Sequence, residues 1–256
     1  MADDFSEFVE RSPSYLTIVP RPAGWEKVFE VAGWAIVPLI MGGFEIYGQL
    51  KKVGLPEVLV IAPESAVKWQ VSGELEFCIG GFKNNILYRR HPHLETVYIQ
   101  ASEYNPYLLR EKIAELARVM ISAGATSFEL SADSANTKKL VMEATAPIVA
   151  QANGAFRVSG RGATKIMWSY TGMGSQNPSL PEALVWYENE PEWQVVWESA
   201  AYHGAKHHNI QICQETSHEL GSDLAVKFQN AGFQLGGSFR TVSSSRLRVD
   251  VIFGNN

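Results

Sequence analysis

The sequence predicts an α+β protein in which a β-rich N-terminal layer precedes two tandem copies of a helix-plus-antiparallel-strand-meander unit. Three observations predict this fold: strand-like alternation early in the chain, two later segments whose helical spacing runs into a glycine and a strand, and a Gly-, Pro- and Ser-rich stretch between them. We expect an N-terminal helix and β-rich region at 1–105, repeats at 106–172 and 183–256, and a linker at 173–182. A chain of 256 residues is long enough to bury a substantial core in this arrangement.

The N-terminal region combines helical and strand-like patterns. Residues 24–52 have largely helical spacing, and EVLVIA (57–62), bounded by prolines, predicts a buried strand. In VKWQVSGELEFCI (67–79), two alternating runs flank a Ser-Gly pair, which is the pattern of a β-hairpin. ILYRR (86–90) and TVYIQ (96–100) predict two further strands.

A duplication is indicated by the correspondence between EKIAELARVMISAGATSFELSA (111–132) and EWQVVWESAAYHGAKHHNIQIC (192–213). In each segment, apolar residues with helical spacing run into a glycine, Gly124 or Gly204, and then into an alternating strand. The two glycines lie 80 positions apart, and glycine favours the left-handed conformation that ends a helix. Each half then closes on another alternating strand, at 166–170 and 247–253. We expect the copies, related by a pseudo-twofold, to form one continuous sheet or to pack back to back.

Composition and charge restrict the function classes. Hydrophobic residues make up 46% and charged residues 19% of the chain, which is typical of a globular protein. The net charge of -5 argues against a nucleic-acid binder, because such proteins usually carry a basic stripe. The chain has only two cysteines, and its acidic N-terminus lacks an apolar run of signal-peptide length, so we expect a reducing, cytoplasmic location.

One uncharged segment, 31–44, leaves two interpretations open. A membrane-spanning helix needs about 20 predominantly apolar residues, and this segment is shorter and contains Pro38 and two glycines. A buried helix that breaks near Pro38 is the favoured interpretation. The alternative is a membrane contact through the apolar side chains Trp34, Ile36, Leu39 and Ile40.

The stretch YHGAKHHNIQIC (202–213) has three histidines and a cysteine, the residue types that bind zinc. His207 and His208 are adjacent, so on a strand they would point to opposite faces. A closed zinc site needs four converging ligands, and the sequence offers no convincing fourth. We therefore favour ordinary scaffold positions at a helix end and in a strand. The candidate metal ligands that remain are His91, His93, His203, His207, His208 and His218.

The segment WYENEPEWQVVW (186–197) places three tryptophans beside several carboxylates. Aromatic faces next to carboxylates are able to hold a cation or a sugar ring, which makes Trp186, Trp193, Trp197 and Glu190 candidate ligand-binding residues. The favoured interpretation is structural: a helix begins at Pro191, and the tryptophans enter the core.

No catalytic motif is evident in the sequence. The Gly-rich stretches GRGATK (160–165) and GMGSQN (172–177) lack the Walker spacing, and no G-x-S-x-G elbow occurs. We therefore expect no cofactor and favour a non-catalytic intracellular recognition or self-assembly module, whose partner is another protein or a second copy. The alternatives are a membrane-acting effector that uses 31–44 and a hydrolase that uses histidines and a bound metal.

Overall fold

A computed structural model describes seven stretches of the chain and shows that it contains both helices and sheets, so the α+β class is confirmed. The described residues fall into two units, one ending at Tyr104 and one beginning at Asn105, and each unit is considered by itself. The described stretches are 15–18, 58–61, 63–78, 80–132, 155–157, 166–214 and 245–254. The predicted helical spacing over 24–52 lies outside them.

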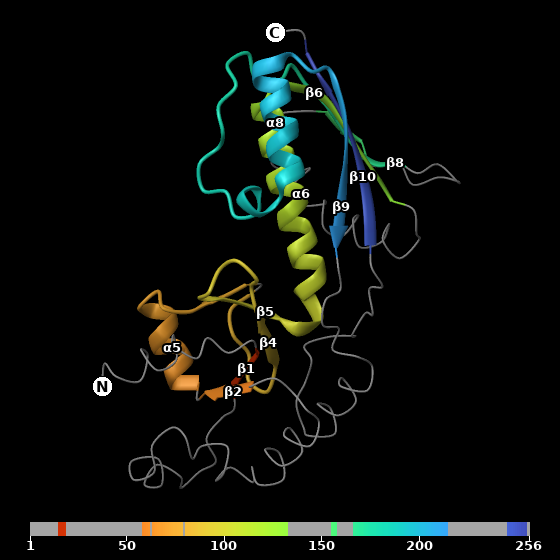
Figure 1. Cartoon of the computed structure of the whole chain (residues 1–256). Coiled ribbons are helices and arrows are strands. Elements are labelled where there is room, and N and C mark those ends of the chain that lie inside the picture. Colours follow the sequence, from red (N-terminus) through yellow and green to blue (C-terminus); the bar gives the residue numbers. More distant parts are fainter. Residues whose placement is uncertain are drawn as a thin grey trace, which may run out of the picture. The chain divides into compact units, whose positions relative to one another are not determined.

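The first unit contains a five-stranded mixed sheet with the order β2-β1-β4-β5-β3 (Figure 1). β1 pairs with β2 and β3 pairs with β5 in parallel, whereas β4 is antiparallel to both of its neighbours. The predicted strands within 57–62, 86–90 and 96–100 are confirmed as β2, β4 and β5. The elements are β1 (Tyr15–Ile18), β2 (Val58–Ile61), α5 (Pro63–Val71), β3 (Glu76–Phe77), β4 (Leu87–Arg90), β5 (Val97–Gln100) and the 3-10 turn η2 (Ala101–Glu103).

The hairpin predicted over 67–79 is wrong, because its first half is the helix α5. Ala66 and Trp69, three residues apart, are buried in the core of the first unit, whereas Val71 is 84% exposed. Val67 is exposed as well, so of the three alternating residues only Trp69 lies on the buried face of the helix. Pro63 at the start of the helix was the signal for the observed structure, because proline suits the first helical turn.

The second unit contains an antiparallel five-stranded sheet with the order β7-β8-β6-β10-β9. Two helices and three strands among its described residues confirm the predicted helical and strand patterns in 111–132, 192–213 and 247–253. The elements are α6 (Tyr104–Ser122), β6 (Ala125–Ala132), β7 (Ala155–Arg157), β8 (Ile166–Thr171), the 3-10 turn η3 (Tyr187–Asn189), α8 (Pro191–His203), β9 (His207–Gln214) and β10 (Ser245–Phe253).

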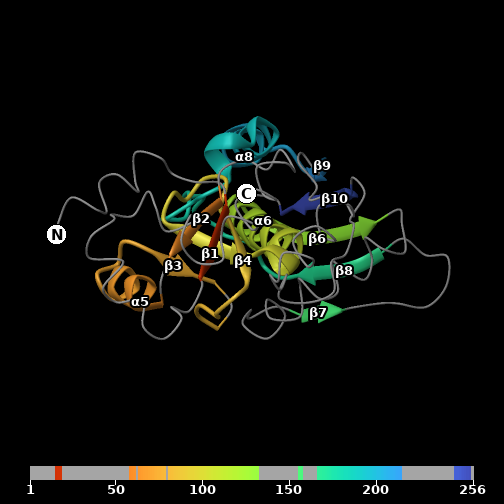
Figure 2. The ribbon, with the colours of Figure 1, turned by 90° about the horizontal axis from the view of Figure 1, so that it is seen from below.

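The helices α6 and α8 cover one face of the sheet in the second unit (Figures 1 and 2). Alternate residues of the strands are buried on this face, whereas the residues between them are mostly polar and less buried. The helices end at the predicted glycines: Gly204 is a left-handed C-cap whose N–H donates to the carbonyl of Ser199, and Gly124 also has a positive φ. The buried strand residues are Phe128 and Leu130 of β6, Ile210 and Ile212 of β9, and Leu247, Val249, Val251 and Phe253 of β10.

Strands from both predicted repeats join this single sheet, with β10 between β6 and β9. Since β10 is antiparallel to both neighbours, β6 and β9 run in the same direction, and the helix that precedes each lies on the same face. A twofold rotation would either reverse the strand direction or move one helix to the opposite face. If these elements are corresponding parts of two copies, the copies are related by a shift of two strands along the sheet and not by the pseudo-twofold that we expected.

Candidate functional site

The three tryptophans of 186–197 are structural residues of the second unit. Trp186, Trp193 and Trp197 are all buried, and α8 begins at Pro191 as predicted. The indole N–H of Trp197 donates to the hydroxyl of Ser122 at the end of α6, at 3.2 Å. Their burial leaves little aromatic surface for an external ligand and supports the core interpretation.

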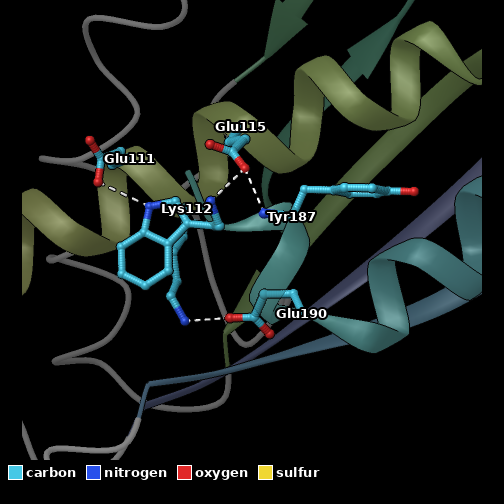
Figure 3. A network of polar contacts seen from close by, with 6 residues as sticks. Glu111, Lys112, Glu115, Tyr187 and Glu190 are labelled. Carbon is cyan, nitrogen blue, oxygen red and sulfur yellow. Dashed lines mark hydrogen bonds and ion pairs between the residues drawn. The ribbon is translucent and has the colours of Figure 1, made fainter. Parts of the chain in front are cut away.

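The cation that occupies the remaining aromatic face belongs to the chain itself. Lys112 of α6 places its Nζ 4.4 Å from the centroid of the Trp186 ring and 2.6 Å from Oε1 of Glu190 (Figure 3). The indole N–H of Trp186 donates to Glu111, one residue earlier on α6, at 3.0 Å. The candidates Trp186 and Glu190 thus do surround a positive charge, but it is a lysine 78 positions from Glu190 in the sequence.

The centre of this network is Glu115, whose side chain is 1% exposed. Its carboxylate accepts three main-chain hydrogen bonds of 2.8 Å: Oε2 from the N–H of Val185, and Oε1 from those of Trp186 and Tyr187 (Figure 3). The Nη2 atom of Arg118 lies 4.0 Å from Oε2. A buried carboxylate with this many charge-assisted donors holds the backbone of 185–187 against α6. We call the six residues Glu111, Lys112, Glu115, Trp186, Tyr187 and Glu190 the α6 clamp.

Sequence reasoning missed Glu115. It lies two residues after Ile113, which places it on the side of α6 opposite the apolar stripe, where a glutamate is usually exposed. It is buried only because the segment before α8 folds over that side of the helix. No local pattern in the sequence signals this contact, since its partners are about 70 positions away.

A serine and a histidine lie within hydrogen-bonding distance in the second unit. The Ser199 hydroxyl of α8 is 3.1 Å from Nε2 of His208 in β9, and it is 2.6 Å from the carbonyl oxygen of Val195. The hydroxyl has one proton and donates it to the carbonyl, so the imidazole must donate to Oγ. An activated nucleophile requires the opposite direction of donation, in which the histidine accepts the serine proton. The pair therefore links α8 to β9 and has no arrangement for nucleophilic catalysis.

Burial lowers the pKa of His208 below its ordinary value of 6.5, and the neighbouring His207 lowers it further. The ring of His208 also packs edge-on against Phe253 of β10, with centroids 6.0 Å apart. A neutral imidazole with a proton on Nε2 fits both the lowered pKa and the bond to Ser199.

The other candidate metal ligands do not converge within the described residues. His91 is buried, and its Nδ1 accepts the main-chain N–H groups of His93 and Leu94, so it stabilises the turn after β4. His203 and His207 are exposed in the second unit. Across the described stretches, no group of three His, Cys, Asp or Glu side chains is arranged to hold a metal ion. His218 lies outside those stretches.

The membrane candidates Trp34, Ile36, Leu39 and Ile40 also lie outside the described residues, so the alternative based on 31–44 stays a prediction. None of the helices in the described ranges combines the length and the apolar composition that a membrane span requires. In the Gly-rich stretch 172–177, Gly172 donates its N–H to the carbonyl of Thr126, and Gly174 packs against Gly124. These contacts use the glycines to seat the loop on β6 and support its structural interpretation.

The strand β9 lies at one edge of the described sheet in the second unit. Among the described strands, β9 pairs with β10 on one side and with none on the other. The N–H of Phe253 donates to the carbonyl of Lys206, which shows that the backbone groups of even-numbered residues of this segment face β10. In an antiparallel pair, every second residue faces the partner strand. The N–H and C=O groups of His207, Asn209 and Gln211 therefore point away from β10.

Within its own residues and its pairing with β10, β9 lacks the features that usually protect an edge strand. It is eight residues long, contains no proline, lysine, arginine, aspartate or glutamate, and pairs with β10 without a register shift. Natural edge strands are commonly short, charged, bulged or interrupted by proline, because a regular open edge pairs with other strands. β7, at the opposite edge of the same sheet, is described over only three residues.

A strip of exposed side chains on α8 borders this edge. Val195, Ser199 and Tyr202 have the spacing of one helix face, and Ser199 touches His208 of β9. Val195 is 63% exposed and Tyr202 is 71% exposed, although both are large and apolar in most of their surface.

A comparison of the chain with protein-family models, curated proteins and solved structures finds no significant match. The site must therefore be interpreted from its own geometry, which presents backbone donors and acceptors beside apolar side chains.

Proposed function

We propose that the chain is a non-catalytic recognition or self-assembly module that binds an extended segment of a protein along the outer edge of β9. The observation that supports this most directly is the regular, uncharged, eight-residue edge of β9 within the described sheet. A strand added there would hydrogen-bond to the outward backbone groups of His207, Asn209 and Gln211. The exposed strip of α8 would supply apolar contacts beside it.

The same proposal includes the tandem duplication. Two helix–glycine–strand segments, in which the helices end at Gly124 and Gly204, both contribute strands to one sheet. Lateral repetition of such a unit leaves a strand at the end of the sheet with an open side, which is the arrangement that strand addition uses. A cytoplasmic location is also part of the proposal, and a chain with only two cysteines is compatible with a reducing compartment.

Amide hydrogen exchange tests the proposal, because it reports each N–H of β9 separately. We expect the N–H groups of Asn209 and Gln211 to exchange rapidly in dilute protein, while those of Ile210 and Ile212, which bond to β10, are protected. Raising the protein concentration or adding a bound partner should protect the first pair. Protection of Asn209 and Gln211 at the lowest concentration, without any partner, would contradict the proposal.

A matched pair of substitutions completes this test. Gln211→Pro removes an outward N–H and leaves the bonds to β10 intact, so partner binding or assembly should be lost while the fold remains. Gln211→Ala removes the side chain alone, and it should bind as the original chain does. Equal binding by the two variants would show that the edge of β9 is not the binding surface.

A further inference from the structure

We propose that the occupant of the β9 edge is a second copy of the chain, paired antiparallel about a twofold axis near Asn209 of β9. This inference rests on the proposed function and adds the identity of the partner. The two five-stranded sheets would then join into one sheet of ten strands. Three features of the second unit support a second copy: the composition of β9, the spacing of the exposed strip on α8, and the charge at the two ends of α8.

The composition of β9 allows the strand to pair with itself. The residues with outward backbones are odd-numbered, and an antiparallel pairing of two β9 strands places odd residues opposite odd residues. Each opposed pair exchanges two N–H···O bonds. Like charges directly opposite each other destabilise a strand pair, and β9 contains no Asp, Glu, Lys or Arg that would oppose its own copy.

The exposed strip of α8 has the spacing that a twofold arrangement requires. Ser199 contacts His208, which is next to Asn209, the central one of the three residues with outward backbones, and Val195 and Tyr202 lie about equally far on either side of Ser199 along the helix. Packed helices lie about 8–10 Å apart, which is roughly the width of two strands. The two α8 helices would therefore be antiparallel neighbours, with Val195 of each facing Tyr202 of the other.

The charges at the ends of α8 are complementary under the same symmetry. The exposed Glu192 lies at the start of α8, whereas the exposed His203 and Lys206 lie at its end. α8 runs antiparallel to β9 through the short turn at Gly204, so the start of the helix lies toward the far end of the strand (Figure 1). A twofold axis near Asn209 would bring Glu192 of each copy toward Lys206 of the other.

Sedimentation equilibrium of the full chain tests this inference. We expect a concentration-dependent equilibrium between one and two copies, which Gln211→Pro shifts toward the single chain and Gln211→Ala does not. Glu192→Lys and Lys206→Glu should each raise the dissociation constant of the dimer by about tenfold, because each makes two like-charge contacts per dimer. The double variant, Glu192→Lys with Lys206→Glu, should restore the original constant, since the swapped charges again meet their opposites in the other copy.

Circular dichroism and thermal unfolding of each variant serve as the control for folding, and the two charge reversals lie on exposed positions. A single chain at every concentration would overturn the inference, as would a double variant that dimerises no better than the single ones. If such a chain still captures a different protein, and Gln211→Pro but not Gln211→Ala abolishes the capture, the proposed function stands and only the second copy is excluded. If nothing protects the outward amides of β9, both proposals fail.

Discussion

Replacing Glu115 by glutamine tests whether the α6 clamp is the structural contact that its geometry indicates. Glutamine keeps the size of the side chain, but it exchanges one acceptor oxygen for an NH₂ group and removes the charge. The amide oxygen is best placed at the Oε1 position, where it still accepts from Trp186 and Tyr187. The NH₂ group then faces the N–H of Val185, so two donors meet in a buried site.

The magnitude follows from these contacts. A lost charge-assisted hydrogen bond costs about 1.5–3 kcal/mol, and a buried donor without an acceptor adds about 1–3 kcal/mol. The variant no longer buries a charge, which offsets part of this cost. We therefore expect Glu115→Gln to lower the free energy of unfolding of the second unit by about 3 kcal/mol.

Urea unfolding followed by tryptophan fluorescence measures this change, because Trp186 and Trp193 lie in the unit concerned. The control is Glu111→Gln, one turn earlier on α6. Glu111 accepts the indole N–H of Trp186, and a glutamine oxygen keeps this bond without leaving a buried main-chain donor unpaired, so the expected loss is smaller, about 1 kcal/mol. Equal losses in the two variants, or a loss below about 1 kcal/mol for Glu115→Gln, would refute the assigned role of Glu115.

Three further predictions concern the second unit. A Cβ on Gly174 (φ +68°) would lie 2.5 Å from the carbonyl oxygen of Gly124, whereas nothing lies within 4 Å of a Cβ on Gly204 (φ +65°). Thermal unfolding should therefore show a loss of stability above ~2 kcal/mol for Gly174→Ala and of about 1 kcal/mol for Gly204→Ala. Equal losses in the two variants would be inconsistent with the clash at Gly174. Lys112→Met should cost about 1–2 kcal/mol in urea unfolding and change Trp186 fluorescence, because it removes both the ion pair and the cation–π contact; unchanged stability and emission would argue against that contact. Because the pKa of His208 is lowered in the folded chain, only the unfolded chain takes up a proton at this residue just below pH 6.5. The contribution of neutral His208 to stability is therefore present above pH 6.5 and declines as the pH falls toward the folded pKa. Stability measured against pH should decline less steeply below pH 6.5 for His208→Gln than for the original chain. Parallel curves for the two proteins would contradict the assignment of this decline to His208.

The parts of the fold that were predictable from the sequence are those with a local signal. α6 and α8 follow from apolar spacing, their ends follow from Gly124 and Gly204, and β9 and β10 follow from strict alternation. α5 was not predicted because Val67, Trp69 and Val71 alternate as in a strand, although in the helix only Trp69 is buried. Periodicity decides such cases poorly without an end signal such as Pro63.

The candidate site was less predictable because its contacts are long-range. The sequence indicated Trp186 and Glu190 only as candidate ligand-binding residues, and nothing local identified Lys112 as the cation beside them. The order of strands in the second sheet is equally non-local, because the strand that pairs with β9 begins 31 positions after Gln214. Which backbone groups of β9 point outward follows from that pairing, so the sequence alone could not reveal them.

The position of β10 has a consequence for synthesis on the ribosome. β10 separates β6 from β9 in the sheet, yet it follows both in the chain, and its last residue comes 39 positions after the end of β9. At ~5–20 residues per second, this interval lasts about 2–8 s. Throughout it, the nascent chain presents two unpaired edges and the apolar side of β9, so this unit is open to chaperones until its central partner strand emerges.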